Sequence, residues 1–529
     1  MDTKALRQKI LDLAIRGKLV PQDPNDEPAS VLLERIREQK KQMVKDGKLK
    51  PKDIKKDTVI FKGDDNLHYE RFNDGTVKCI EDEIPFELPE GWEWCNLGLI
   101  TDVFGRIGFR GYTKNDLVAK GKGAITLSPS NIIDNKMDYS SCTYISWAKY
   151  EESPEIMIHN NDILLVKTGS SYGKSAFVED LPEKATINPQ FVVLKETRIN
   201  PQFLCYFLQS NYAKVNFDKL VVGTAIPTFS QANLNAMYIA FPGINEQKRI
   251  VNKILELLKY IDTINDEKKC LQSVILQTKS KILDLAIHGK LVPQDPNDEP
   301  ASVLLERIRA EKEELIKQGK IKRNKKESVI FKGDDNSYYL RTNGLEEPLD
   351  DWRFNNLPET WEICCLGELC DYGDCINVNT EDIAEDAWIL DLEDIEKDTG
   401  IVIKKVTKAQ RNSVSTKHQF HSGQVLYSKL RPYLNKVVLS DDDGYCTSEI
   451  LPLEFKNCVL PEYARYYLMS GTFLAYANHC SYGVKMPRLG TADGKKAIFP
   501  LPPSSEQKRI VETIEFYFSQ LNKISESLA

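Results

Sequence analysis

Twenty residues of this chain, KLVPQDPNDEPASVLLERIR, occur twice, at 18–37 and at 290–309. The identity extends backward, so that between 9–37 and 281–309 only Arg16 and His288 differ. Shorter matches follow in the same order in both halves: VIFKGDDN, then LPE-x-WE, then EQKRIV. The same order, at offsets that fall from 272 to 260 residues, indicates a tandem duplication of about 265 residues. The chain therefore has to fold as two copies of one arrangement.

Long helices are expected around the two EQKRIV sequences. Between 246 and 291 apolar residues recur at steps of three and four, and 6–15 and 508–528 repeat the pattern. A stripe this narrow suits an antiparallel coiled coil, with an ordinary helical bundle as the alternative. One such helical unit is unbroken in the middle of the chain and the other is divided between its two ends, so we expect the ends to meet.

The regions between the helices are rich in predicted β-structure. Short apolar runs such as DILLVK and QVLYSKL are separated by Gly, Asn and Asp, and a helix is expected after Pro201 and after Pro461. The predicted fold class is α+β, with two mixed α/β, β-rich domains separated by long antiparallel coiled-coil helices in a pseudo-twofold tandem repeat. The expected segments are helical region 1–45, basic linker 46–88, β-rich domain 89–243, central helical region 244–318, basic linker 319–356, β-rich domain 357–503 and helix 504–529.

Composition limits the class of protein. No run of 18 apolar residues exists and the start, MDTKALRQKI, lacks an apolar signal stretch, so we expect a soluble cytoplasmic protein without a membrane segment. The 12 cysteines are scattered without C-x-x-C pairing, which disfavours zinc and favours reduced thiols. A formal net charge of −7 argues against nucleic-acid binding unless positive charge is concentrated locally.

Such a concentration occurs in the second β-rich domain. Residues 401–436 contain eight Lys or Arg and no acid, whereas 381–398 contain nine acids and one Lys. A local basic face can engage DNA phosphates on an acidic protein, although a solvated surface is the alternative. Arg can also bond a guanine edge and Asn an adenine edge. The DNA-binding candidates here are Lys404, Lys405, Lys429, Arg431, Tyr433, Asn435, Lys436, Tyr482, Lys485 and Arg488.

The first β-rich domain has a parallel set. KTGSSYGKS at 167–175 corresponds to YSKLRPYLNK, and VVGTAIPTFS at 221–230 corresponds to CSYGVKMPRLG. Ordinary turns at strand ends are the alternative explanation. The candidates are Lys167, Ser170, Ser171, Tyr172, Lys174, Thr224 and Thr228. The lysine-rich stretches 45–56 and 317–326 are compatible with DNA contact, partner contact or a flexible linker.

Three motifs that suggest other chemistry are incomplete. GSSYGKS has three residues between its glycines where a phosphate-binding P-loop needs four. NPQF at 188–191 has Gln190 where adenine methyltransferases carry a second proline. His418 and His421 lack a third ligand at metal spacing. We therefore predict no catalytic residue and no metal site.

This layout resembles the specificity (S) subunit of Type I restriction–modification systems. The resemblance rests on EQKRIV after FPGIN and FPLPPSS, and on the helix leading into KILDLAI-x-GKLVPQDPNDEP; Gly243-Ile244 stand where the family usually has Pro-Pro. It implies two target recognition domains, each reading half of an asymmetric bipartite site in double-stranded DNA. It also implies two methyltransferase (M) subunits on the helical regions and restriction (R) subunits. This chain would be non-catalytic and without cofactor, with S-adenosylmethionine, ATP and Mg in the partner subunits.

The near-identical repeats suggest where a partner binds. Their loop residues are polar, and core packing does not obviously require them to be the same in both halves. Since 99–240 and 368–498 share little, two copies of one partner explain the identity better than a recent duplication, although sequence exchange is a further alternative. The partner-binding candidates are Gln22, Asp23, Asp26, Gln294, Asp295 and Asp298. The rival functions are a DNA-modifying enzyme and a protein scaffold without DNA contact.

Overall fold

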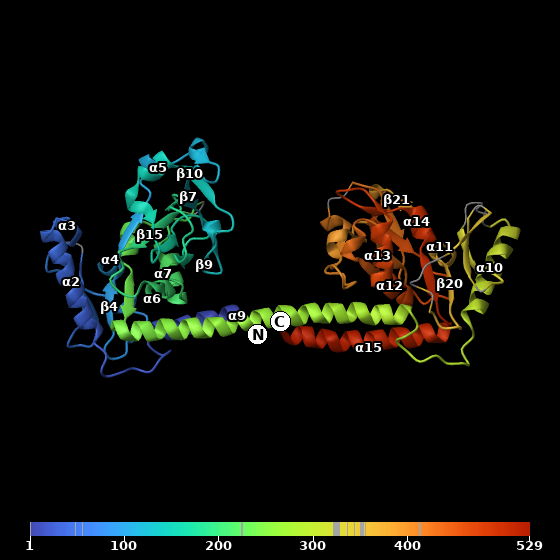
Figure 1. Cartoon of the computed structure of the whole chain (residues 1–529), viewed down its shortest axis with the longest axis horizontal. Helices are drawn as coiled ribbons and strands as arrows, with labels where there is room; N and C mark the ends of the chain where they lie inside the picture. Colours follow the sequence, from blue (N-terminus) through green and yellow to red (C-terminus); the bar gives the residue numbers. More distant parts are fainter. Residues whose placement is uncertain are drawn as a thin grey trace. The chain divides into compact units, whose positions relative to one another are not determined.

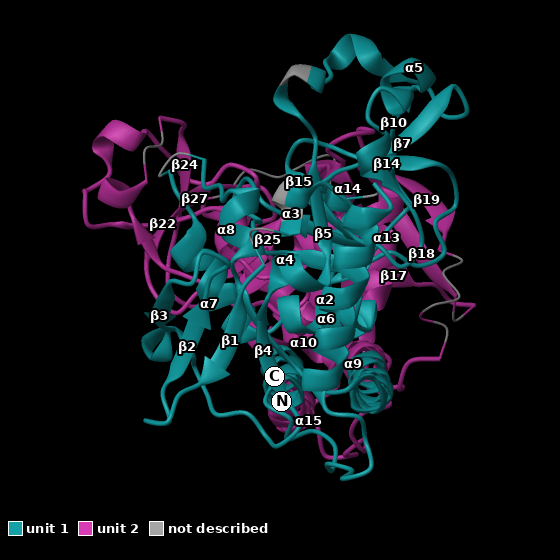
Figure 2. Ribbon diagram, turned by 90° about the vertical axis from the view of Figure 1, so that its left-hand side faces the viewer, with its two compact units in different colours: residues 1–267 teal, residues 268–529 magenta. Residues whose placement is uncertain are grey.

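The computed structural model describes residues 2–47, 49–54, 57–223, 226–320, 328–335, 337–342, 344–349, 354, 356–411 and 414–528. The chain divides into two compact units, Met1–Glu267 and Lys268–Ala529, which are coloured separately in Figure 2. Helix α9 (Ile244–Ile287) begins in the first unit and ends in the second. The elements follow one another in the same order in both units, as the duplication predicts. No helix in the described part of the chain has the length and apolarity needed to cross a bilayer.

In unit 1, helix α1 (Thr3–Ile15) packs along the first part of α9. Asp2 caps α1 by accepting hydrogen bonds from the amides of the first turn, and Gly17 ends it in the left-handed region at φ +65°. Arg7 of α1 pairs with Asp262, whereas Gln22, beyond the end of α1, bonds Glu246 at the start of α9. The two helices therefore run antiparallel.

In unit 2, helix α15 (Ser504–Leu528) lies along the second part of α9 (Figure 1). The Lys279 Nζ donates to Asn522 Oδ1 at 2.6 Å, and Gln294, beyond the end of α9, bonds Glu506 at the start of α15. This pair is antiparallel too, so the predicted antiparallel pairing is confirmed in each unit. The meeting of the two chain ends stays a prediction.

The β-rich part of unit 1 contains a five-stranded sheet, β11-β14-β7-β10-β6, and a four-stranded sheet, β13-β12-β15-β5. Every residue of DILLVK that forms β12 is buried; Ile163 and Leu165 face the helices, whereas Leu164 and Val166 face the other sheet. A strand covered on both faces is apolar throughout. The strands are β4 (Glu93–Asn96), β5 (Asp102–Gly105), β6 (Leu117–Val118), β7 (Gly123–Leu127), β8 (Ile132–Ile133), β9 (Lys136–Met137), β10 (Thr143–Ser146), β11 (Met157–Ile158), β12 (Ile163–Val166), β13 (Ser175–Phe177), β14 (Ala185–Ile187), β15 (Phe191–Lys195) and β16 (Tyr238–Phe241).

The β-rich part of unit 2 repeats this plan with a five-stranded sheet, β21-β24-β27-β22-β23, and a three-stranded sheet, β26-β25-β28. In β25, Val425 and Tyr427 face the helices and Leu426 faces the other sheet, as in β12. The strands are β20 (Glu362–Cys365), β21 (Asn377–Val378), β22 (Trp388–Leu390), β23 (Val406–Thr407), β24 (Lys417–Phe420), β25 (Val425–Ser428), β26 (Val437–Leu439), β27 (Gly444–Thr447), β28 (Ile450–Leu453), β29 (Ser481–Tyr482), β30 (Arg488–Leu489) and β31 (Ile498–Leu501).

Helices cover these sheets at the expected places. Pro201 and Pro461 each occupy the first turn of a helix, where a missing amide hydrogen costs nothing. The remaining helices are α2 (Ala29–Lys45), α3 (Pro51–Ile54), α4 (Leu97–Ile100), α5 (Trp147–Glu151), α6 (Pro201–Leu208), α7 (Asn211–Leu220), α8 (Gln231–Asn235), α10 (Ala301–Lys317), α11 (Leu366–Leu369), α12 (Pro461–Met469), α13 (Gly471–His479) and α14 (Thr491–Lys496).

Each segment predicted as a basic linker contains a folded three-stranded antiparallel sheet, which corrects that prediction. Unit 1 has β1 (Val59–Lys62), β2 (His68–Arg71) and β3 (Val77–Cys79). Unit 2 has β17 (Ser328–Lys332), β18 (Tyr338–Thr342) and β19 (Leu345–Pro348). The strands were missed because they are short and many of their side chains are exposed, so they lack an apolar alternation.

Candidate nucleic-acid interface

In unit 1 the two predicted DNA-binding segments lie against each other. KTGSSYGK connects β12 to β13, and its Thr168 forms a backbone bridge to Thr228, with the two hydroxyls 2.8 Å apart. The Gly169 amide donates to the Pro227 carbonyl at 2.9 Å. A backbone bridge also joins Val222 to Thr228. We call 167–174 together with the described residues 222–223 and 226–228 the loop pair of unit 1.

Unit 2 contains the same arrangement. The loop after β25 is bridged at Leu430 to Arg488, and the Arg431 amide donates to the Pro487 carbonyl at 2.7 Å. The hairpin of β29 and β30 corresponds to 222–228, and each turns at a glycine in the left-handed region, Gly223 at φ +92° and Gly483 at φ +98°. We call 429–436 together with 482–488 the loop pair of unit 2. The predicted correspondence between the four segments is confirmed.

The candidates of the first loop pair differ in accessibility. Ser170 and Lys174 are exposed and Ser171 is half-buried. Lys167 is half-buried, and burial lowers the pKa of its ammonium group. The Tyr172 hydroxyl donates to Asp218 of α7 at 2.8 Å, which raises the pKa of the tyrosine and orients its ring. Thr228 fixes the pair through Thr168, and Thr224 lies outside the described residues.

The candidates of the second loop pair separate into supporting and accessible groups. Arg488 makes a forked ion pair with Glu449, with its Nη2 2.6 Å from Oε1, and Asn435 donates to the Met469 carbonyl at 3.2 Å. These two side chains hold the loop in place. Tyr433, Tyr482 and Lys485 are exposed.

Arg431 combines backbone strain with an unsatisfied side chain. Its φ of +51° lies in the left-handed region, which is uncommon for a residue with a side chain. Its buried Nε has no hydrogen-bond partner among the described residues. The buried Nε cannot itself reach an external acceptor, but the side chain as a whole is only half-buried, and an arginine on this loop suits a phosphate or a guanine edge.

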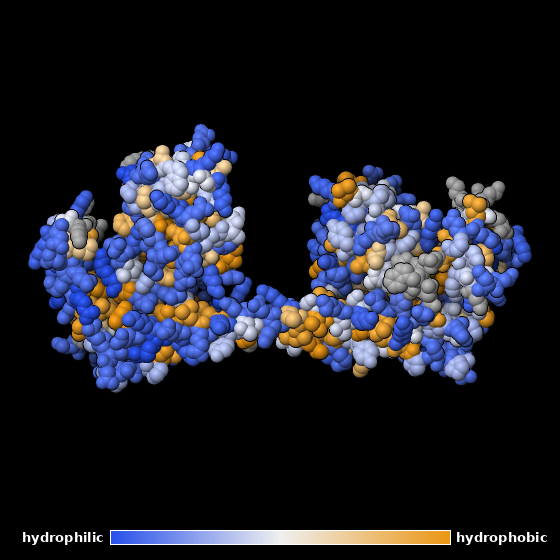
Figure 3. Space-filling model, viewed as in Figure 1, coloured by the Kyte–Doolittle hydropathy of each residue, from blue (hydrophilic) through white to orange (hydrophobic). Residues whose placement is uncertain are grey.

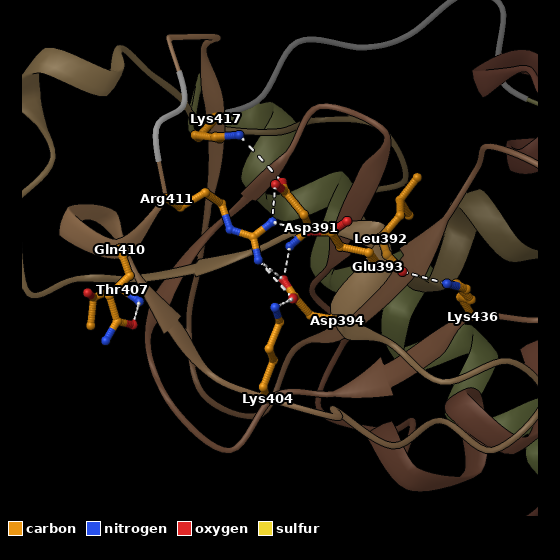
Figure 4. A network of polar contacts seen from close by, with 10 residues as sticks. All are labelled: Asp391, Leu392, Glu393, Asp394, Lys404, Thr407, Gln410, Arg411, Lys417 and Lys436. Atoms are coloured by element: carbon orange, nitrogen blue, oxygen red, sulfur yellow. Dashed lines mark hydrogen bonds and ion pairs between the residues drawn. The ribbon is translucent and has the colours of Figure 1, made fainter. Parts of the chain in front are cut away.

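The prediction that residues 401–436 form a basic face is wrong. Figure 4 shows Arg411 between Asp391 and Asp394, with its Nη2 2.6 Å from Asp394 Oδ2. Asp394 is 0% exposed, and a buried carboxylate requires a cation nearby. The acidic segment before this stretch therefore folds onto it and neutralises much of its charge.

Three residues predicted to contact DNA belong to this neutralised region. Lys404 lies 3.9 Å from Asp394, Lys405 lies 2.8 Å from Asp441, and the Lys436 Nζ donates to the Leu392 carbonyl at 2.5 Å. Burial also lowers the pKa of Lys436. Acidic and basic residues that are separate in the sequence are therefore paired in the folded chain. Lys404, Lys405 and Lys436 are not the free cations that were expected.

Exposed apolar side chains at the loop tips were missed. Val222 and Ile226 are 62% and 65% exposed in unit 1, and Val484 and Met486 are exposed at the corresponding hairpin of unit 2. The available signal was a pair of apolar residues close to a turn glycine in each segment. Such side chains suit thymine methyl groups and base steps.

The histidine pair serves local structure. The buried His418 Nδ1 lies 2.8 Å from the Ile450 carbonyl, and His421 lies 3.3 Å from Asp443. Within the described ranges no group of three His, Cys, Asp or Glu side chains could hold a metal ion.

The predicted partner-binding loops bond the chain itself. In unit 1, Glu246 accepts from Gln22 at 2.8 Å and from Trp92 Nε1 at 3.1 Å, and Arg249 pairs with Asp26 at 2.6 Å. Burial raises the pKa of Glu246. We call this set the polar clamp of unit 1.

The polar clamp of unit 2 matches it contact by contact. Glu506 accepts from Gln294 at 2.5 Å and from Trp361 Nε1 at 2.9 Å, and Arg509 pairs with Asp298 at 2.6 Å. Burial raises the pKa of Glu506 as well.

The clamps correct the premise that packing does not require these polar residues to be identical. The glutamine of each EQKRIV adds a buried bond, since Gln247 accepts from the Asn200 amide and Gln507 from the Leu460 amide, both at 2.7 Å. Asp23 and Asp295 are exposed and bond the amides of Asn25 and Asn297 locally, at 2.9 Å in each case. These two aspartates therefore remain accessible to a partner.

The two β-rich domains share one plan and are joined to their helices by clamps made of the same residues. Their loop pairs differ in sequence, so the duplicated chain carries two different candidate binding surfaces. The family of the Type I restriction modification DNA specificity domain matches residues 89–273 and again 358–528. The chain belongs to this family, and each match covers one β-rich part together with residues of the long helix that follows it. The resemblance identified from the sequence is confirmed.

Individual relatives agree with this assignment. The Type I restriction enzyme EcoAI specificity subunit of Escherichia coli is 30% identical over 585 residues, which cover 98% of this chain and 90% of that protein. The EcoEI specificity subunit of Escherichia coli is 28% identical over 600 residues, covering 99% and 90%.

A solved structure described as the structural basis underlying complex assembly and conformational transition of the type I R-M system matches with a TM-score of 0.52. The match has 16% identity and covers 84% of this chain and 94% of that chain. At this identity the likeness supports the fold.

Proposed function

We propose that this specificity subunit reads an asymmetric, bipartite site in double-stranded DNA, with one loop pair on each half-site. The observation that carries the proposal is that the loop pairs occupy the same place in both units yet differ in sequence. A common scaffold with unlike tips is what two different half-sites require.

The accessible loop residues divide into two kinds of contact. Lys174 and Lys485, which are exposed, and the half-buried Lys429 suit phosphates, which position a domain without specifying sequence. The half-buried Arg431 and the exposed apolar side chains of the hairpins suit base edges. Lys404 and Lys405 would have to exchange an internal aspartate for a phosphate, so we assign them a minor role.

We further propose that the chain is non-catalytic and holds two methyltransferase subunits, with restriction subunits completing the complex. S-adenosylmethionine, ATP and Mg would serve those partners. Asp23 and Asp295 offer accessible polar contacts in each half. Hydrophobic residues are also exposed on the helix pair of unit 2, including Leu276 and Phe516. Figure 3 shows orange areas along these helices. Exposed apolar surface of this kind marks protein interfaces.

The test uses the assembled methyltransferase complex and its mapped DNA target. Replacing Arg431 and Lys485 with Ala should weaken binding to the target, with the loss confined to one half-site. The control is Lys404→Ala, which removes an internally paired cation. Unchanged affinity in the double variant would favour a scaffold without DNA contact. Methyl transfer by the purified chain alone would favour an enzyme.

A further inference from the structure

The three-stranded sheets in the predicted linkers carry the same exposed or half-buried side chains on one face in both units. In unit 1, Phe61 pairs with Tyr69 across β1 and β2, and in unit 2, Phe331 pairs with Tyr339 across β17 and β18. Because side chains alternate along a strand, the neighbours Val59 and Arg71 share the face of Phe61 and Tyr69. We call this set, with its counterparts Val329, Phe331, Tyr339 and Arg341, the outer aromatic face.

The geometry of the outer aromatic face is similar in the two units, although Arg341 is also paired with Glu346. The ring centroids of the Phe and Tyr are 5.9 Å apart in unit 1 and 5.8 Å apart in unit 2. An arginine guanidinium stands over each phenylalanine, at 5.6 Å for Arg71 and 4.3 Å for Arg341. Each tyrosine hydroxyl donates to an aspartate of the GDDN turn, at 2.7 Å in unit 1 and 2.9 Å in unit 2.

The inner face of the same strands has changed. In unit 1 the buried Glu70 accepts from Thr58 at 2.7 Å and from Tyr238 at 2.9 Å. In unit 2 the corresponding Leu340 packs among the apolar cluster of Ile330 and Ile363. His68 and Phe72 are likewise replaced, by Tyr338 and Thr342, while an Ile and a Lys are kept. Each inner face therefore fits its own domain.

This pattern reverses the usual constraint, in which buried positions are kept and exposed positions vary. Neither recent duplication nor sequence exchange distinguishes the two faces of one strand, so neither explains it. A requirement that acts on the outer aromatic face alone does explain it. Such a requirement arises when both sheets contact the same molecule.

We propose that each outer aromatic face docks one copy of the same protein partner. The proposal rests on the proposed function, which supplies a partner present twice, the methyltransferase subunit. Tyr, Phe and Arg are the residue types enriched at the centres of protein interfaces. The adjacent exposed aspartates, Asp64 and Asp334, repel DNA phosphates and complement a basic group on the partner. The third strands differ, with Val77 opposite Arg71 but Glu346 opposite Arg341, so the contact is confined to the first two strands.

The experiment uses the full chain titrated with the methyltransferase subunit of the same system. Phe61→Thr with Arg71→Thr alters unit 1, Phe331→Thr with Arg341→Thr alters unit 2, and a fourfold variant alters both. Threonine keeps the strand propensity, and thermal unfolding checks that each variant is folded. The control is Leu67→Ser, which places on the turn of unit 1 the residue that unit 2 carries at Ser337.

Native mass spectrometry should show two partner copies on the wild-type chain and on the control. Each twofold variant should bind one copy at least tenfold more weakly, and the fourfold variant should weaken both. Folded variants that bind two copies with unchanged affinity would overturn the inference. So would variants that lose DNA binding or self-association of the chain while keeping the partner. A wild-type chain that binds no methyltransferase would instead overturn the proposed function.

Discussion

The polar clamps and the loop pairs are each present twice, but the two clamps have the same sequence whereas the two loop pairs have different sequences. The two clamps are built from the same residues with the same contacts, because in each unit they join a loop to the start of a helix. The two loop pairs share a backbone plan while their side chains differ. Sequence is retained in the clamps, where the chain binds itself, and varies in the loop pairs, where we propose that it contacts DNA.

The largest expected effect comes from breaking a clamp. Glu506→Ala leaves Trp361 Nε1 and Gln294 without their acceptor and removes a buried neighbour of Arg509. We expect a loss of about 2–4 kcal/mol in the free energy of unfolding, measured by thermal or denaturant unfolding. Glu246→Ala should cost a similar amount, because its contacts are the same. A loss in only one unit would show that the clamps are not equivalent.

The second prediction concerns the loop pair of unit 2. Arg431→Ala should cost about 1–3 kcal/mol of specific binding, measured by titration of the assembled complex with target DNA. Specificity should relax at one half-site, and the free energy of unfolding should change little because the side chain has an unmet donor. Lys404→Ala should change affinity less than twofold. An equal loss in both variants would restore the basic-face interpretation.

A smaller effect is expected from the loop pair of unit 1. Ile226→Ser removes an exposed apolar side chain from the hairpin tip. We expect a loss of about 1 kcal/mol in binding, in line with the loss of one apolar contact to a base. The loss in binding can be measured by competition between DNA targets, each of which is altered in one half-site. Relaxed specificity at the half-site affected by Arg431→Ala would contradict the division between the units.

The smallest effect is the pH dependence of the clamps. Burial raises the pKa of Glu246 and Glu506 above the value in the unfolded chain. The folded state therefore binds more protons than the unfolded state, and stability falls as pH rises from about 4.5 through the folded pKa. Replacing both with Gln removes this ionisation and should flatten the stability–pH curve in that range. An unchanged curve would place the pH dependence in other groups.

The repeats, the long helices and the loop correspondence could be predicted because they follow from identity and periodicity. The clamps could not, because Gln22, Asp26 and Glu246 are residue types normally found on surfaces, and their partners are far away in sequence. The prediction of a basic face was wrong for the same reason, because the acidic partners of these cations lie elsewhere in the sequence. Arg411 and Asp394 have opposite charges in separate stretches of sequence, and only the fold brings them together.

Mapping of methylated bases resolves the central claim most directly. DNA from cells that carry the system with wild-type chain is compared with DNA from cells that carry the Arg431→Ala, Lys485→Ala chain. The account predicts a target that becomes degenerate in one half and stays unchanged in the other. Degeneracy in both halves, or an unchanged target, would contradict it.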